Sequence, residues 1–221
     1  MARESGNTQS FSRLFLLLAF TLLLPCAQAS VLGNGGSVPP SPITPMGPII
    51  ATASGTIAPS VGSAHFSVDF TENVFQDPAN MFCAGCLDFV YVFTNHGPDV
   101  NERYSMSSFA GFMLNVGTDP FNVATNPSTI DRSNNGNGPN VGFNFPGIIE
   151  VAAGMTTVSL VIQTNATHVV PGTVTAQDGV AGSVAALAPA VIPEPGSLVL
   201  MGGGLIAVGG FLRRSRFGNR S

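Results

Sequence analysis

The feature that most constrains this chain is a period of two in its apolar residues. In the stretch HFSVDFTENVF, Phe66, Val68 and Phe70 occupy alternate positions and polar residues lie between them. Because successive side chains of a strand point to opposite faces, this pattern predicts a half-buried β-strand. Residues 87–94, LDFVYVFT, are mostly aromatic or β-branched, which is typical of a central strand.

Further strand-like stretches follow along the chain. Residues 103–116 predict one or two strands broken near Gly111, residues 142–145 a short one, residues 156–164 a clear one, and residues 167–187 one or two more. No interior stretch has a helical period. Roughly seven short strands between turn residues predict an all-β fold, an antiparallel β-sandwich. Of the 16 Phe in the chain, 11 fall in residues 49–188 and supply apolar volume for its core.

The N-terminal region has the three parts of a secretory signal peptide. A weakly positive stretch runs to Arg13, an apolar run covers residues 14–24, and the small-x-small signature of Ala27 and Ala29 follows. As a helix, the run would span about 16 Å, too short for a bilayer core of about 30 Å. We therefore predict a signal peptide over residues 1–29, cleaved before Ser30.

Two alternatives for this region are a buried core helix and a lipoprotein signal acylated at Cys26. Pro25 is a poor substitute for the small residue that a lipidation site needs before its cysteine. After the cleavage site, residues 30–48 are rich in Gly, Pro and Ser, which predicts a linker. The β-sandwich domain is then expected over residues 49–188.

The C-terminal region combines three signals in a fixed order. Residues 196–212 are apolar and uncharged, about 25 Å long as a helix, which predicts a transmembrane helix. A positive cluster after an apolar span keeps its own side cytoplasmic. The prolines before the span hold the entering backbone extended. The residues that carry these signals are Pro193, Glu194, Pro195, Arg213, Arg214 and Arg216.

This arrangement over residues 191–216 resembles the PEP-CTERM sorting signal of Gram-negative bacteria. The resemblance implies recognition and removal of the tail by an exosortase, an integral-membrane cysteine transpeptidase-like enzyme. It also implies an association with exopolysaccharide and with delivery to the surface or matrix. The family pattern is followed here by a short cytoplasmic tail, residues 217–221. A permanent single-pass anchor is the alternative, and it differs only in whether cleavage occurs.

Charge is distributed unevenly along the chain. Residues 1–29 carry +1 and residues 193–221 carry +3 of a total of −4, so the residues between them carry −8. Nucleic acids and anionic membrane surfaces attract basic patches. Neither is therefore expected as a partner of the central domain.

Cys83 and Cys86 form a C-x-x-C pair that remains after loss of the signal peptide. In an oxidising compartment we expect a structural disulfide. A redox site would need a helix N-terminus to lower a thiol pKa, whereas this pair precedes a predicted strand. A metal site with a histidine is a further alternative, although structural zinc usually has four ligands at regular spacing. The histidines are His65, His96 and His168.

Residues 131–138, DRSNNGNG, have an oxygen-rich pattern that suggests a calcium loop. However, Gly142 stands where a bidentate Glu should be, and turn chemistry explains the Asn and Gly residues without an ion. No nucleophile elbow, P-loop or zinc-protease motif is present. We expect a non-enzymatic protein without a cofactor or metal.

The sequence thus predicts an exported protein, anchored in the inner membrane before processing and then placed at the cell surface or outside the cell. Its central domain is expected to be structural or adhesive. A ligand- or calcium-binding module and a secreted hydrolase with clustered carboxylates are the rival hypotheses. The expected partners are the exosortase, the membrane and the exopolysaccharide matrix.

Overall fold

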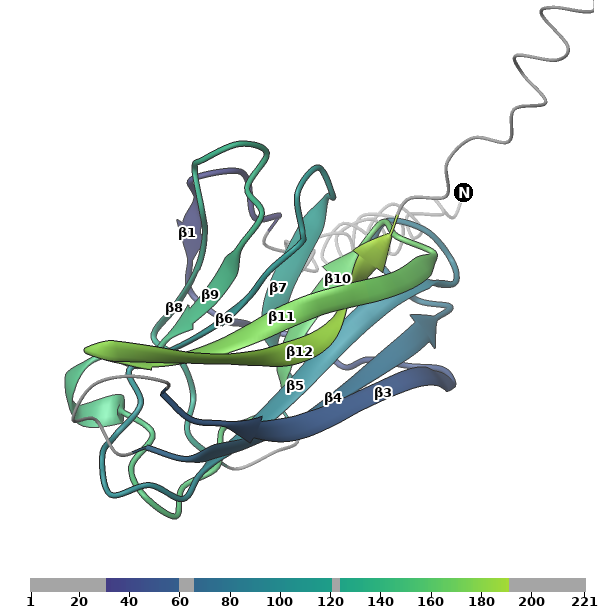
Figure 1. The fold of residues 1–221 in the computed structure, drawn as a ribbon. Coiled ribbons are helices and arrows are strands. Elements are labelled where there is room, and N and C mark those ends of the chain that lie inside the picture. The colour runs from purple at the N-terminus through teal and green to yellow at the C-terminus, as the bar shows by residue number, and fades with distance from the viewer. Residues whose placement is uncertain (1–30, 60–65, 121–123, 191–221) are drawn as a thin grey trace, which may run out of the picture.

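The computed structural model describes residues 31–59, 66–120 and 124–190, which form two β-sheets packed face to face (Figure 1). The predicted all-β, sandwich-like fold is confirmed. Within those ranges no helix has the length and hydrophobicity of a bilayer span. The predicted signal peptide and transmembrane helix lie outside the described residues, as do Cys26 and His65.

The first sheet has the strand order β2-β7-β10-β5-β4-β3. All its pairs are antiparallel except β2 with β7. The stretch expected to be a central strand is β5, which lies between β10 and β4. The strands are β2 (Ser41–Pro42), β3 (Ile49–Ile57), β4 (Val68–Asp77), β5 (Cys86–Asn95), β7 (Leu114–Thr118) and β10 (Leu160–Thr164).

The second sheet has the order β1-β8-β9-β6-β11-β12 and is antiparallel throughout. A single 3₁₀ turn, η1 (Gly147–Ile149), follows β9. The strands are β1 (Ser37–Val38), β6 (Arg103–Met106), β8 (Thr129–Arg132), β9 (Val141–Asn144), β11 (His168–Asp178) and β12 (Val180–Ala190).

Each stretch that the apolar pattern assigns to strands contains one or two of them, but β1, β2, β3 and β8 lie outside those stretches, and β4 begins at Val68, after Phe66. The break near Gly111 separates β6 from β7, and Gly111 has a φ of 80° that favours glycine. β10 covers only the second half of residues 156–164. The predicted linker runs along the sandwich instead of away from it, and it buries Leu32 and Ile43.

Aromatic rings fill the space between the sheets. Phe93 of β5 stacks on Tyr104 of β6 with ring centroids 4.0 Å apart and planes 9° apart, so this contact joins the two sheets. Phe89 meets Phe109 edge to face at 5.6 Å. These rings are buried, and aromatic pairs of this geometry add to the free energy gained from area burial alone.

One open side of the sandwich is closed where edge strand β3 lies beside edge strand β12. Small residues permit this approach. A Cβ on Gly182 would lie 2.4 Å from Ala58 O, and a Cβ on Gly55 would lie 3.6 Å from Val184 Cγ2. Neither edge is therefore left fully open to pair with another chain.

A buried carboxyl group crosses this seam. Glu72 of β4 lies in the inward-facing row of Val68, Phe70 and Val74, and its Oε2 accepts the Leu187 N–H of β12 at 2.8 Å. Tyr91 contacts the Glu72 carboxyl group, and its hydroxyl lies 3.5 Å from Leu187 O. Side chains of the first sheet thus bind the backbone of Leu187 at the edge of the second.

The position of Glu72 changes its acidity. Burial raises the pKa of Glu72 to about 7, against the opposing effects of the Leu187 N–H and the Tyr91 hydroxyl. Burial disfavours the charged form because water no longer solvates it. A pKa that is higher in the folded than in the unfolded protein contributes stability below about pH 4.5, and this stability is lost as pH rises through about 7.

Replacement of the buried carboxyl by an amide, Glu72→Gln, should remove this pH dependence. The free energy of unfolding of the variant relative to wild type should rise between pH 4.5 and pH 8, by on the order of 3 kcal/mol. Urea unfolding across this range measures it. The exposed Glu102→Gln is the matched control. Parallel curves of unfolding free energy against pH for wild type and Glu72→Gln would contradict a raised pKa of Glu72.

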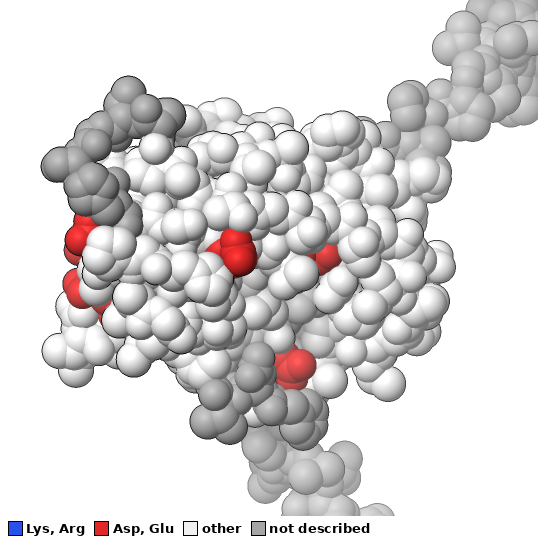
Figure 2. All heavy atoms as spheres, turned by 60° about the horizontal axis from the view of Figure 1, so that its bottom comes forward, with Lys and Arg blue, Asp and Glu red and all other residues white. Residues whose placement is uncertain are grey.

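The two arginines of the described domain are used internally. Arg103 pairs with Asp131 and also donates to Asn144, and the guanidinium of Arg132 donates to backbone carbonyls including Phe109 O at 2.8 Å. The face in Figure 2 accordingly shows acidic side chains and no basic ones. The charged groups visible on this side of the domain are therefore acidic, and they are scattered over a mostly uncharged surface.

Candidate functional site

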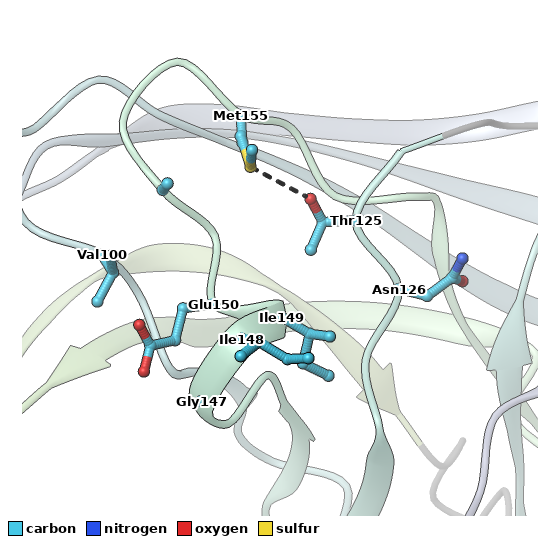
Figure 3. A pocket seen from close by; sticks show the side chains of 9 residues that line it. Val100, Thr125, Asn126, Gly147, Ile148, Ile149, Glu150 and Met155 are labelled. Carbon is cyan, nitrogen blue, oxygen red and sulfur yellow. Dashed lines mark hydrogen bonds between the residues drawn. The ribbon is translucent and has the colours of Figure 1, made fainter.

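The loops at one end of the sandwich line a pocket of about 540 Å³ that is open to solvent (Figure 3). Ile148 of η1 is fully exposed beside it, and Met155 approaches from the facing loop, where Thr125 Oγ1 contacts its sulfur. Among the described residues of the lining, Glu150 is the one that is ionisable. The other described residues that line the pocket are Val100, Asn126, Gly147, Ile149 and Ala152.

The predicted calcium loop uses its carboxylate within the protein. Asp131 accepts hydrogen bonds from Arg103 and from Asn144 Nδ2, and these contacts lower the pKa of Asp131 against the opposing effect of burial. Arg132 Nε donates to Gly138 O at 2.9 Å and closes the loop. Glycine suits position 138 because its φ is 64°.

The histidines are also far apart in the described residues. His96 contacts Asp69 at 3.0 Å, and His168 contacts the Thr167 hydroxyl at 3.0 Å. In the part of the chain that the structure describes, no three His, Cys, Asp or Glu side chains gather as a metal site would require.

The opposite end of the sandwich is where the chain leaves towards the predicted sorting signal. β12 ends at Ala190, which pairs with His168 at the start of β11. We call this the exit end. The predicted sorting and cleavage residues lie outside the described residues, and these are Ala27, Ala29, Ser30, Pro193, Glu194, Pro195, Arg213, Arg214 and Arg216.

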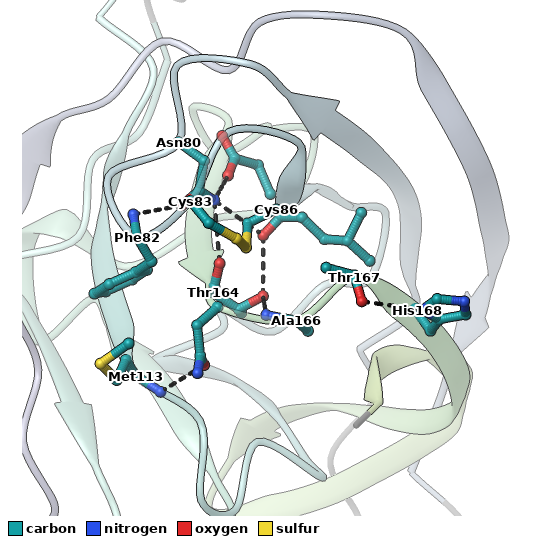
Figure 4. Close-up of a disulfide and its surroundings, with 12 residues drawn as sticks. Asn80, Phe82, Cys83, Cys86, Met113, Thr164, Ala166, Thr167 and His168 are labelled. Atoms are coloured by element: carbon teal, nitrogen blue, oxygen red, sulfur yellow. Dashed lines mark hydrogen bonds between the residues drawn. A yellow bond between two sulfur atoms is a disulfide. The ribbon is translucent and has the colours of Figure 1, made fainter. Parts of the chain in front are cut away.

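The predicted disulfide lies at the exit end (Figure 4). Cys83 and Cys86 are bonded across the β4–β5 turn, with Cα atoms 5.3 Å apart. Cys83 is exposed and Cys86 is buried at the first position of β5. The pair thus precedes a strand rather than opening a helix, as the sequence predicts.

Asn80 fixes the disulfide turn to the sheet. Its Nδ2 donates to Asp88 Oδ1 at 2.7 Å and to Thr164 O of β10 at 3.2 Å. Its Oδ1 accepts the Phe82 N–H at 2.8 Å. One buried amide therefore joins the turn, β5 and β10.

Asp88 and Asp77 form a buried carboxyl pair below this turn. Burial and, to a smaller extent, the contact with Asp77 raise the pKa of Asp88 to about 7, while hydrogen bonds from Gln163 and Asn80 act in the opposite direction. Both carboxyl groups are at most 1% exposed. The two carboxyl groups are clustered, as the hydrolase hypothesis expects, and both are buried.

Sequence reasoning missed Glu72, Asn80 and the carboxyl pair. For Glu72 a signal was available, because the period of two that places Val68 and Phe70 inward also places residue 72 inward. For Asp88 the contacts come from β10 and from the turn, which are distant in sequence or irregular.

Loss of the Asn80 amide should loosen the exit end. The variant Asn80→Ala leaves Asp88 Oδ1 and Thr164 O without this donor, which should lower the free energy of unfolding by on the order of 2 kcal/mol. Thermal or urea unfolding of the oxidised protein measures the change. The exposed Asn135→Ala is the matched control, and equal stability of the two variants would contradict the role of Asn80.

Comparison with known proteins gives a match to the segment after β12. The family model of the PEP-CTERM protein-sorting motif matches residues 191–215. No curated protein and no solved structure matches the chain.

Proposed function

From the premise that this chain carries a PEP-CTERM protein-sorting motif, and so is exported and targeted to an exosortase, we propose that it is a structural or adhesive component of the envelope or the extracellular matrix. The sandwich is the cargo and the tail is its delivery signal. The proposal includes an inner-membrane anchor before processing and a surface or matrix location after it.

The observation that carries this proposal is the position of the motif relative to the fold. The last described strand, β12, ends at Ala190, and the motif match begins at residue 191. A folded domain and a sorting signal therefore follow each other without a further domain between them. Removal of the tail would release the sandwich with all of its strands.

Each part of the motif has a physical role in this proposal. Pro193 and Pro195 keep the backbone extended, which a processing enzyme needs in order to bind it, and Glu194 lies between them. The apolar residues 196–212 retain the precursor in the bilayer. Arg213, Arg214 and Arg216 keep the end of the tail on the cytoplasmic side.

The properties of the sandwich support a non-catalytic role. Its clustered carboxyl groups, Asp77 and Asp88, are buried and serve to fix a turn. Both arginines are bound to groups of the domain itself. The seam between the two sheets is closed by Glu72, and such closure suits a domain that must persist outside the cell.

A second candidate function is a ligand-binding module held permanently in the membrane by the same apolar segment. The open pocket of about 540 Å³ favours it, since ligand sites are concave and largely apolar with few polar groups. Calcium binding is the less favoured form of this candidate because Asp131 is paired with Arg103.

Intact-mass measurement of the envelope and secreted forms, in the native host with and without the exosortase, tests the proposal. With the enzyme, the mass should correspond to a chain that starts at Ser30 and ends near Pro193. Without it, the tail should be retained. A retained tail in both strains would contradict sorting and favour the permanently anchored module.

The variant Glu194→Gln, which changes the charge within the motif, should reduce removal of the tail by the exosortase. Glu102→Gln makes the same chemical change at an exposed position of the sandwich and should leave processing unchanged. The ratio of processed to unprocessed protein, by mass spectrometry, is the measurement. Equal processing of the two variants would mean that Glu194 is not part of the recognised element.

A further inference from the structure

Large exposed aliphatic side chains gather at the exit end. Six of them, between 41% and 53% exposed, lie on segments that meet there. We call this set the exit face. It consists of Met46, Ile49, Ile50, Met81, Met113 and Val170.

The strand register places these residues at one end of the molecule. Ile49 pairs with Phe75 near the end of β4, so residues 46–50 lie beside the disulfide turn that carries Met81. The Met113 N–H donates to Asn165 Oδ1 in the β10–β11 turn. Val170 pairs with Ala188, two residues before the end of β12.

The exit face is almost free of charge. In residues 46–50, 77–86, 113 and 168–170, the groups that can carry charge are Asp77, which is buried, and His168. Glu102, Glu150 and Asp178 lie towards the other end, near the pocket and the β11–β12 turn. In Figure 2 acidic side chains occupy the left and middle, and none lies towards the right, where β4 and β12 end in Figure 1.

The length of chain beyond the sandwich sets the distance to the membrane. The apolar run starts at Gly196, six residues after Ala190. An extended chain advances at most about 3.5 Å per residue, so the exit end lies within about 20 Å of the bilayer while the tail is attached. The domain cannot move farther away without unfolding β12.

We propose that the exit face rests on the lipid bilayer in the membrane-held precursor, with the six aliphatic side chains in contact with the lipid interface and the acidic end directed away. This inference rests on the proposed function, because it requires the tail to be in the membrane. Exposed apolar patches mark interaction sites, and aliphatic side chains gain free energy on entering the interface. Carboxylates would be repelled by anionic lipids, so their location at the other end favours the same orientation.

A fluorescence experiment with two matched variants tests the orientation. The precursor is isolated from a host that lacks the exosortase and is inserted into vesicles of phosphatidylcholine and phosphatidylglycerol. A bimane label is attached in separate preparations at Ile50→Cys, on the exit face, and at Ile148→Cys, at the far end. Brominated phosphatidylcholine in the vesicles then quenches only a label that contacts lipid.

The expected result is loss of emission from the label at position 50 and unchanged emission at position 148, with both proteins floating with the vesicles. A further variant, Met81→Asp with Met113→Asp, should restore the emission at position 50 while flotation persists. These substitutions are at exposed positions and should therefore leave the fold intact.

Other outcomes distinguish the inference from the function on which it rests. Flotation without quenching at position 50, or with equal quenching at both positions, would overturn the orientation and leave the anchored tail intact. Emission at position 50 could instead change with the number of protein molecules per vesicle and not with brominated lipid. That result would assign the exit face to contact with a second copy of the chain, and it would also overturn the proposed orientation. Failure to float with the vesicles would contradict the membrane-held precursor itself.

Discussion

The hydrogen bond from Leu187 to Glu72 is the contact on which the closure of this sandwich depends. A sandwich of two open sheets has edge strands whose backbone groups lack partners. Here the N–H of edge strand β12 is satisfied by a carboxyl group that comes from the inward face of the other sheet, with Tyr91 beside it. Because the segment that follows β12 carries the sorting motif, the same contact holds the strand that joins the cargo to its delivery signal. The buried carboxyl makes this closure sensitive to pH, with greater stability in the acidic range.

The two ends of the sandwich differ in chemistry, and the difference matches the direction in which the chain leaves. The exit end carries aliphatic side chains, the disulfide turn and the start of the motif, whereas the far end carries the pocket and several carboxylates. In the orientation that we propose for the membrane-held precursor, the pocket is directed away from the lipid. After cleavage, the exit face would no longer be held near the bilayer, so processing would change which surface of the protein is free. The proposed structural role and the proposed orientation are thus argued from the same arrangement of strands.

The sequence predicts some parts of this arrangement well because their physics is local. The alternation of Phe66, Val68 and Phe70 predicts a strand, which the structure confirms from Val68 onward, and the aromatic run of residues 87–94 predicts a central strand, which is also confirmed. The structure of residues 31–48 is harder to predict from the sequence. Their Gly and Pro content is typical of a flexible linker, whereas Leu32 and Ile43 are buried by strands far away in sequence. The partners of Asp88 likewise come from β10 and from the β4–β5 turn, which no local pattern connects. The sorting motif could be predicted from the sequence because its three signals are contiguous.

Amide hydrogen exchange at Leu187 is the measurement that tests the closure of the sandwich most directly. Leu187 lies on an edge strand, where an amide without a partner exchanges quickly, and we predict protection close to that of the central strand β5. Glu72→Ala should remove this protection, while Glu72→Gln, whose side-chain oxygen still accepts the N–H, should retain it. Rapid exchange at Leu187 in the wild type, or equal protection in wild type and Glu72→Ala, would show that Glu72 does not close this edge of the sandwich.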